Sequence, residues 1–566
     1  MPSLAISNLL RRRRAKEVKE PDFGERPSYL VSYLESFKQK HGEEPMMVER
    51  LSGDMKMWSK INVVYPVGGG IFVHVTNLVK TAAGFNQYIV VEPPRPPSNL
   101  FKAIEEALAL KIKPEYAMES AEERKKILLE LLEEILDVRD KPVKYNSIKP
   151  GLPRVPVNKE DVEHVKYHLI RDKIGVGVIE PFLRDPYLED ISAKGIGNIY
   201  VVHKIFGSLE SNVGFASEEE LDEYIIKLGE KIGKPISRAR PVVDATLPDG
   251  SRLNIVYGTD VSLFGSNFTI RKVAKTPLSV TQLIKWSTFD EYVAAYMWMM
   301  LSEGMSAFIC GETASGKTTT LNALAVFIRP NYKIVSIEDT AEVTLPHKNW
   351  VRELTRDTGK PESSVMMFDL LKAALRQRPN YIIVGEIRGA EGNIAFQAIQ
   401  TGHPVLSTFH AANLERLLQR LTNPPISVPK TNLDALNIAW FQSSVYDKRG
   451  LLVRRMISIN EIVGYDPRTD SIVAIPVFLW DPTRDVFRFA GRGASYLLEE
   501  KIAVMRGISR KDMKLIYEEL ELRAKYLRLL VDKNVLDYYD VFKAVVKAHE
   551  LGLEEAYKKL TRGELF

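Results

Sequence analysis

Apolar and polar positions alternate along this chain with two different periods, which predicts a mixture of helices and strands. Leucine and isoleucine recur at helical spacing between Glu and Lys residues from Leu128 to Ile135, the pattern of an amphipathic helix. A further helix is expected at 29–40. Short apolar runs bounded by turn residues, at 61–65, 71–75 and 87–92, predict strands.

Changes in this pattern predict five regions. A proline-rich run at 93–98 ends the first region, and the prolines within 149–156 mark a linker. The regions are an α+β region at 1–100, a helical segment with the linker at 101–157, an α+β domain at 158–274, an α/β domain at 275–500 and a helical segment at 501–566. Within the fourth region, apolar strands alternate with amphipathic helices, which is typical of a parallel sheet. The predicted fold class is multidomain α/β.

Composition excludes several classes of protein. The net charge of +5 over 566 residues is too small for a protein that coats nucleic acid, so no nucleic-acid partner is expected. The single cysteine, Cys310, excludes an internal disulfide and a cysteine-rich zinc site, and a buried strand position is expected for it. No apolar run approaches the ~20 residues of a bilayer span, so we expect a cytoplasmic protein whose membrane role is peripheral.

Four consecutive arginines stand near the N-terminus, at 11–14. No long apolar segment follows them, so they do not begin a secretory signal. A solvated basic tail is the simpler interpretation, and contact with acidic lipid or a partner protein is the alternative.

The strongest motif is a glycine-rich run with the spacing of a phosphate-binding loop. It follows an apolar strand at 307–310 and opens a helix, as such loops do. Gly311 and Gly316 let the backbone fold around an anion, and Lys317 then reaches the β/γ-phosphates of ATP while Thr318 reaches Mg²⁺. The predicted nucleotide-binding residues here are Gly311, Glu312, Thr313, Ala314, Ser315, Gly316, Lys317, Thr318 and Thr319.

Acidic residues end two later apolar strands, where parallel strands open onto a ligand crevice. Glu338 or Asp339 is placed to orient the attacking water, and Glu386 to hold Mg²⁺ directly or through water. Acidic residues that only cap the next helices are the alternative. A short strand then separates His403 from His410, and either imidazole is a candidate to contact a γ-phosphate or its water.

Four motifs are now in place: the glycine-rich loop, two strands that end in acidic residues and the strand between the two histidines. Through them, residues 158–490 resemble the secretion ATPase superfamily of type II secretion, type IV pilus and archaellum motors. The resemblance implies a RecA-like P-loop ATPase domain preceded by an α+β, PAS-like domain. It implies that Glu338 rather than Asp339 is catalytic, together with Lys317 and Glu386. It also implies a homohexamer that docks on a polytopic membrane platform protein, at the inner face of the cell membrane.

In that superfamily, arginines of the preceding domain reach the ATP of a neighbouring subunit. The matching segment 237–252 offers Arg238, Arg240 and Arg252, and Arg271 is a fourth candidate. An arginine there neutralises charge on the γ-phosphoryl group; an ordinary ion pair is the alternative for each. The chain lacks a four-cysteine motif and carries the aromatic stretch 465–489. In both respects it is similar to archaeal members, including the archaellum motor.

Two other groups of residues are assigned structural roles. His164 and His168 have the spacing of a metal pair, but no third ligand is evident, so zinc is not expected. Tyr292, Tyr296 and Trp298 fall near helical spacing, for which core packing is expected rather than adenine stacking.

The sequence therefore predicts a hexameric, Mg²⁺-dependent ATPase that powers assembly or rotation of an archaellum or pilus-like filament, or secretion of its subunits. The alternatives are a DNA-transfer ATPase or other nucleic-acid translocase, a pilus-retraction motor, and a scaffold that binds nucleotide without cleaving it. If Glu338 orients the attacking water, the Glu338→Gln variant is expected to bind ATP but fail to cleave it.

Overall fold

The computed structural model describes residues 26–112, 120–148, 151–273, 276–356, 362–448 and 450–565. It divides into two compact units, Met1–Val273 and Ala274–Phe566. The basic tail that the sequence predicts at 11–14 lies outside the described residues.

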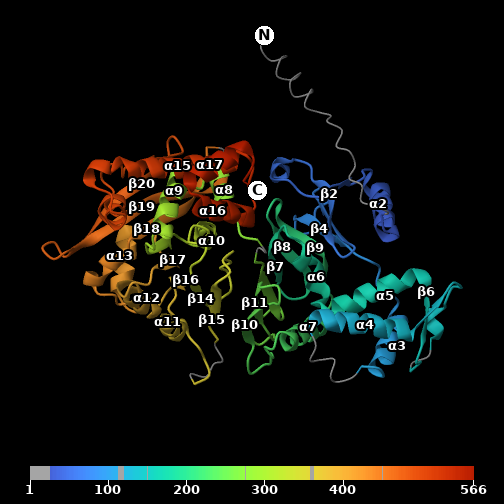
Figure 1. The fold of residues 1–566 in the computed structure, drawn as a ribbon. Helices are drawn as coiled ribbons and strands as arrows, with labels where there is room; N and C mark the ends of the chain where they lie inside the picture. Colours follow the sequence, from blue (N-terminus) through green and yellow to red (C-terminus); the bar gives the residue numbers. More distant parts are fainter. Residues whose placement is uncertain are drawn as a thin grey trace, which may run out of the picture. The chain divides into compact units, whose positions relative to one another are not determined.

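A large sheet forms the centre of the first unit (Figure 1). Its strands are β1 (Met46–Met47), β2 (Asn62–Gly68), β3 (Ile71–Thr76), β4 (Asn86–Val91), β7 (Leu188–Ala193), β8 (Gly197–His203), β9 (Gly207–Phe215), β10 (Val242–Thr246), β11 (Arg252–Val256) and β12 (Asn267–Arg271). They lie in the order β1-β2-β3-β4-β9-β8-β7-β12-β11-β10. The pairs β1–β2 and β4–β9 are parallel, and the others are antiparallel. The β4–β9 pairing carries the sheet across the boundaries expected at residues 100 and 158.

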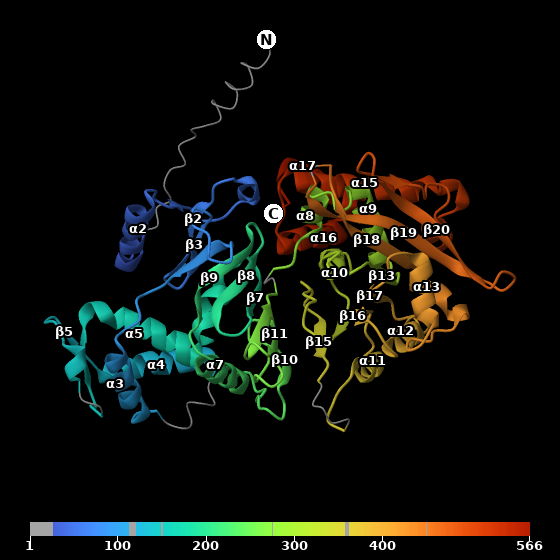
Figure 2. The ribbon, with the colours of Figure 1, turned by 180° about the vertical axis from the view of Figure 1, so that it is seen from behind.

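Helices cover both faces of this sheet. The helices of the first unit are α2 (Ser28–His41), α3 (Ser98–Ala109), α4 (Ala121–Ile135), α5 (Val162–Leu169), α6 (Glu180–Arg184) and α7 (Glu218–Lys231). Helix α2 packs on one face through a small cluster that includes Leu34 and Phe72, while α6 and α7 belong to the larger core. A separate cluster joins α3, α4 and α5 to the strand pair β5 (Leu136–Arg139) and β6 (Val155–Asn158) (Figure 2).

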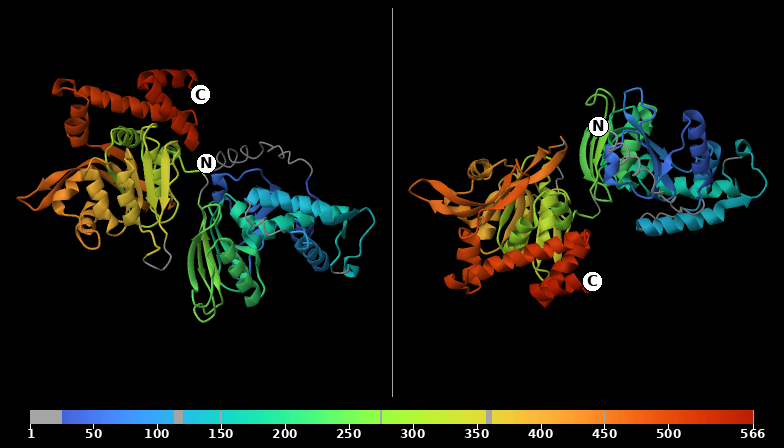
Figure 3. Two further views of the ribbon diagram at one scale, coloured as in Figure 1. Left: turned by 60° about the horizontal axis from the view of Figure 1, so that its bottom comes forward. Right: turned by 90° about the horizontal axis from the view of Figure 1, so that it is seen from above.

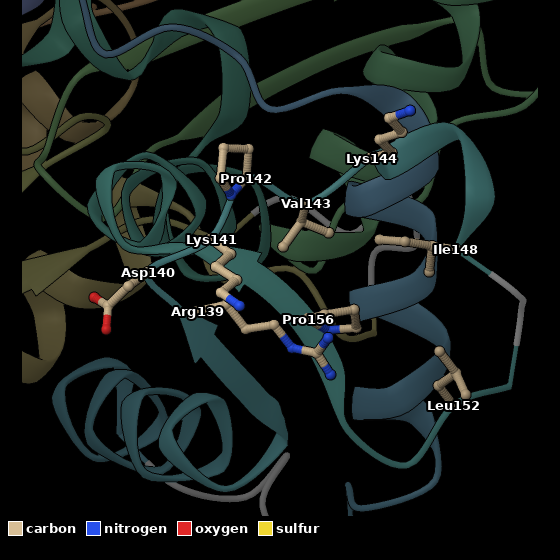
Figure 4. Close-up of a pocket in the computed structure, with 9 residues that line it drawn as sticks. All are labelled: Arg139, Asp140, Lys141, Pro142, Val143, Lys144, Ile148, Leu152 and Pro156. Atoms are coloured by element: carbon tan, nitrogen blue, oxygen red, sulfur yellow. The ribbon is translucent and has the colours of Figure 1, made fainter.

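An open hollow of about 660 Å³ lies beside the β5–β6 pair (Figure 4). Its lining residues are Arg139, Asp140, Lys141, Pro142, Val143, Lys144, Ile148, Leu152 and Pro156. Arg139 forms an ion pair with Asp137 at 2.7 Å. None of the site residues predicted from the sequence lines this hollow.

The second unit contains one mixed sheet. Its strands are β13 (Ala307–Cys310), β14 (Ile334–Glu338), β15 (Trp350–Leu354), β16 (Tyr381–Ile387), β17 (Val405–Phe409), β18 (Ile438–Tyr446), β19 (Leu452–Asp466), β20 (Ser471–Asp481) and β21 (Val486–Phe489). The order is β15-β14-β16-β17-β13-β18-β19-β20-β21. The strands from β15 to β18 are parallel, but β18 to β21 pair antiparallel. The expectation of a parallel sheet throughout is therefore wrong for β18–β21, because their short connections permit only antiparallel pairing.

Helices also cover both faces of the second sheet. They are α8 (Val280–Lys285), α9 (Glu291–Ser302), α10 (Lys317–Ala325), α11 (Met367–Arg376), α12 (Glu391–Gln400), α13 (Leu414–Thr422), α14 (Ala503–Met505), α15 (Lys514–Asp532), α16 (Tyr538–Leu551) and α17 (Leu553–Arg562). One core contains α8, α9 and α10 together with the C-terminal helices α15 to α17, whereas α11, α12 and α13 pack on the other face. Figure 3 shows the C-terminal helices in red along one side of this unit. The segment expected at 501–566 is thus part of the same core.

Helix α9 is buried almost all round. Core packing is confirmed for Tyr296 and Trp298, and the Tyr296 hydroxyl donates to Glu461 Oε1 at 2.7 Å. It is wrong for Tyr292, which is 37% exposed at the start of the helix. Among the described helices, none has both the length and the apolar composition of a membrane span.

Candidate nucleotide-binding site

The glycine-rich loop connects the end of β13 to the start of α10. Because β13 lies between parallel neighbours, the loop sits at the carboxyl edge of the sheet, where ligands bind in open α/β sheets. Gly316, with φ of 89°, directly precedes α10. A Cβ atom on Gly311 would lie 2.5 Å from the carbonyl oxygen of Gln442, so only glycine fits there. The backbone N–H groups at the start of α10 thus face an anion-binding position.

Lys317 lies at the first position of α10 and is only 8% exposed. Its Nζ atom donates to the carbonyl oxygen of Glu312 at 2.9 Å. Burial lowers the pKa of Lys317, and the negative charges of Glu386 and Glu342 oppose that shift. The lysine is therefore a buried cation close to carboxylates, beside the half-buried Thr318.

Glu386 and His410 meet at the ends of the adjacent strands β16 and β17. The Nε2 atom of His410 lies 2.8 Å from Oε1 of Glu386. That buried oxygen has this imidazole as its polar neighbour, whereas Oε2 accepts a hydrogen bond from Arg388 Nε at 2.8 Å. Burial lowers the pKa of His410, and the charge of Glu386 opposes this. Since Gly311 donates its N–H to Phe409, these side chains flank the glycine-rich loop.

His403 is not brought to the glycine-rich loop. It precedes β17, whereas His410 follows that strand, so the two imidazoles stand at opposite edges of the sheet. The Nδ1 atom of His403 lies 3.3 Å from the Thr401 hydroxyl.

Glu338 is 1% exposed, and both of its carboxylate oxygens are occupied. Oε1 accepts from the N–H groups of Glu342 at 2.7 Å and Val343 at 2.6 Å, and Oε2 accepts from Arg352 Nε at 3.2 Å. Burial raises the pKa of Glu338, and these donors oppose the shift. Oε1 thus holds the turn at Glu342 and Val343, whereas Oε2 carries a single longer contact, so the role of Glu338 in orienting a water molecule stays a prediction. Asp339 is exposed and accepts from the Thr355 hydroxyl.

Glu342 follows Glu338 in the same acidic segment and was not singled out from the sequence. Glu338 holds its backbone N–H, and Asn322 Nδ2 of α10 donates to its carbonyl oxygen at 3.0 Å. Its charge weakly opposes the lowering of the pKa of Lys317. The available signal was its place at the end of the same acidic segment as Glu338.

The candidate arginines all belong to the first unit. Arg252 opens β11 and Arg271 closes β12, and the two are direct partners in the antiparallel pairing. Arg271 Nε lies 3.8 Å from Asp190 Oδ1. Arg238 and Arg240 are exposed in a turn in which the N–H of Arg240 donates to the carbonyl oxygen of Ser237.

The residues that were assigned structural roles have protein contacts. His168 Nε2 lies 2.8 Å from the carbonyl oxygen of Pro93, and His164 Nδ1 lies 3.8 Å from Asp161 Oδ1. Cys310 is buried at the end of β13, as predicted, and burial raises the pKa of its thiol.

The chain is similar to several known proteins. Residues 172–436 match the family model described as type II/IV secretion system protein. An uncharacterized protein of Methanocaldococcus jannaschii is 48% identical over 543 residues, which cover 94% of this chain and 96% of that protein. VirB11 of Agrobacterium fabrum is 28% identical over 41% of this chain and 74% of its own length. The X-ray structure of the Legionella pneumophila ATPase DotB aligns at 19% identity, with a TM-score of 0.39, over 60% of this chain and 93% of that chain.

Proposed function

This chain belongs to the type II/IV secretion system protein family, and on that premise we propose that it is a Mg²⁺-dependent ATP hydrolase that drives assembly of an archaellum or pilus-like filament, or secretion of its subunits. The resemblance to the secretion ATPase superfamily is confirmed, and the relatives include archaeal proteins. The proposal of hydrolysis is carried by the pairing of Glu386 with His410 at the strand ends beside the glycine-rich loop.

The glycine-rich loop and α10 hold the triphosphate in this proposal. The first N–H groups of α10 have no partners within the helix, and the helix dipole adds positive potential at that end. Lys317 exchanges its contact with the Glu312 carbonyl for the β- and γ-phosphates, which costs little because that carbonyl still accepts from the hydroxyl and the N–H of Ser315. Binding energy is thereby concentrated on the phosphates.

The residues present fit a magnesium ion. Mg²⁺ usually binds one or two carboxylates together with substrate phosphates. Glu386 Oε1 is a buried carboxylate oxygen beside the His410 imidazole, and the Thr318 hydroxyl stands in the first turn of α10. When bound, the ion neutralises charge that develops on the phosphates.

We assign the orientation of the attacking water to Glu342 and the orientation of Glu342 to Glu338. The hydrogen bonds from Glu338 and Asn322 fix the backbone of Glu342 on both sides. His410 is held against Glu386 and contacts the γ-phosphate or its water. The assignment to Glu342 rests on the three donors that Glu338 already accepts, from two N–H groups and from Arg352.

The remaining features follow from membership of the family. We propose that the second unit is the RecA-like module, that the PAS-like fold lies within 158–273, and that the protein acts as a homohexamer on a membrane platform protein. Arg240, Arg252 or Arg271 then supplies positive charge to a neighbour's ATP, where such arginines contribute on the order of 10³–10⁵ in rate. Closure around ATP and release after hydrolysis couple chemistry to movement of the units.

The purified protein is expected to hydrolyse ATP only with Mg²⁺ and to assemble into hexamers with nucleotide. Turnover and mass by light scattering, measured with and without Mg·ATP, test this. Single-stranded DNA and acidic vesicles are added in separate arms. Turnover raised many-fold by DNA would instead favour a nucleic-acid translocase.

Glu386→Gln is expected to raise the Mg²⁺ concentration needed for half-maximal turnover by about tenfold, because the variant loses the charge of a metal-directed carboxylate. A magnesium titration of ATP turnover measures this. Glu415→Gln, at an exposed position of α13, is the matched control and should behave as the wild type. An unchanged magnesium requirement in Glu386→Gln would remove Glu386 from the metal site.

A further inference from the structure

One side of the glycine-rich loop is held by the hairpin of β18 and β19. Gln442 Nε2 donates to the carbonyl oxygen of Ser315 at 2.8 Å, and the Ser444 hydroxyl donates to that of Ala314 at 3.1 Å. Arg454 Nε reaches the same Ala314 oxygen at 3.4 Å. These donors come from two antiparallel strands and contact two consecutive peptide groups of the loop.

These contacts set the direction of the backbone N–H groups. A trans peptide points its carbonyl and its N–H in opposite directions. When Gln442 holds the carbonyl of Ser315, the N–H of Gly316 is turned away from the hairpin, toward the position of a bound phosphate. The neighbouring peptide is held on both sides, because the N–H of Ser315 donates to Glu312.

The conformation of Ala314 requires such support. Its φ is 62°, in the left-handed region that residues with a side chain seldom adopt. Backbone conformations of this kind persist where surrounding contacts over-determine them, and they cluster at ligand-binding sites. The two donors on the Ala314 carbonyl are contacts of that kind.

Gln442 is itself firmly oriented. It is 3% exposed, and its Oε1 atom accepts from Trp440 Nε1 at 3.0 Å. Trp440 is fully buried and packs edge-on against Phe289, with ring centroids 5.3 Å apart. The contact with Trp440 therefore fixes which end of the Gln442 amide is the donor, and that end faces the loop.

We propose that Gln442 is a positioning residue for nucleotide binding, which shapes the glycine-rich loop from the β18–β19 hairpin. The proposal rests on the function proposed above. Gln442 does not touch the nucleotide; it acts through the Ser315–Gly316 peptide, and Trp440 fixes its amide.

The test uses the full-length protein and the variant Gln442→Met, which keeps the length of the side chain but removes its donor and acceptor. The dissociation constant for Mg·ATP is expected to rise about tenfold, as for loss of one buried hydrogen bond. Amide hydrogen exchange across residues 311–316 is expected to quicken, a readout that distant destabilisation would not move selectively. Gln397→Met, at an exposed position of α12, is the matched control.

A double-mutant cycle separates positioning from general packing. Trp440→Phe removes the N–H that orients Gln442, so Trp440→Phe with Gln442→Met should bind Mg·ATP no more weakly than Gln442→Met alone. Additive losses would overturn the proposal, as would wild-type affinity in Gln442→Met. If Gln442→Met does not fold, Ser444→Ala and Arg454→Met test the proposal instead. Binding of Mg·ATP that is two- to threefold weaker in each variant, as for weak exposed contacts, supports control of the loop by the hairpin. Wild-type affinity in both variants refutes it. Failure of the wild type to bind ATP would refute the proposed function instead.

Discussion

Lys317→Ala is expected to weaken ATP binding by on the order of 100-fold. A charge-assisted hydrogen bond contributes about 1.5–3 kcal/mol, and every 1.4 kcal/mol is a factor of ten in affinity. Lys317 is a buried cation at the start of α10 that faces the phosphate position, so its loss removes more than one such contact. Titration with a fluorescent ATP analogue in the presence of Mg²⁺ measures the effect.

Lys348→Ala is the matched control for this experiment, because Lys348 is an exposed lysine of the same unit. It should bind ATP as the wild type does. Thermal unfolding of both variants excludes loss of fold as the cause. ATP affinity within a factor of two of wild type in Lys317→Ala would show that the glycine-rich loop is not the phosphate site.

Glu342→Gln is expected to retain ATP binding while its turnover falls by on the order of 10²–10³. A positioned carboxylate that accepts a proton contributes about 10²–10⁴ in rate, and glutamine keeps the shape without the basicity. The backbone contacts of Glu342 do not involve its side chain, so they persist in the variant. Single-turnover hydrolysis alongside the binding titration separates the two effects.

Glu338→Gln is the informative comparison. Its remaining carbonyl oxygen can still accept from the N–H groups of Glu342 and Val343, so the turn survives and only the contact with Arg352 is lost. Turnover should therefore fall by less than about tenfold, the range of one partly exposed ion pair. If instead Glu338→Gln binds ATP without cleaving it and Glu342→Gln turns over normally, the water belongs to Glu338, as the sequence first suggested.

The parts of the site that are continuous in the chain could be predicted from the sequence. Gly311, Gly316 and Lys317 lie within seven residues, so their spacing already encodes the turn, the helix start and the buried cation. Glu386 and His410 were also recognised, because each ends an apolar run that has the signature of a buried strand. The strands at 61–65, 71–75 and 87–92 were predicted for the same reason and appear as β2, β3 and β4.

The local pattern of residues thus determined which elements form and which of them carries the phosphate chemistry, since backbone propensity and side-chain periodicity act over a few residues. Only the tertiary structure decided how distant segments meet. It paired β4 with β9, about 120 residues apart, gave both oxygens of Glu338 hydrogen-bond donors, and set Gln442 against the loop. Such outcomes depend on contacts between segments that are far apart in the sequence, and the local hydrophobic pattern does not encode those contacts. They also depend on which donor pairs with which acceptor, and donors compete for acceptors only after the segments have packed.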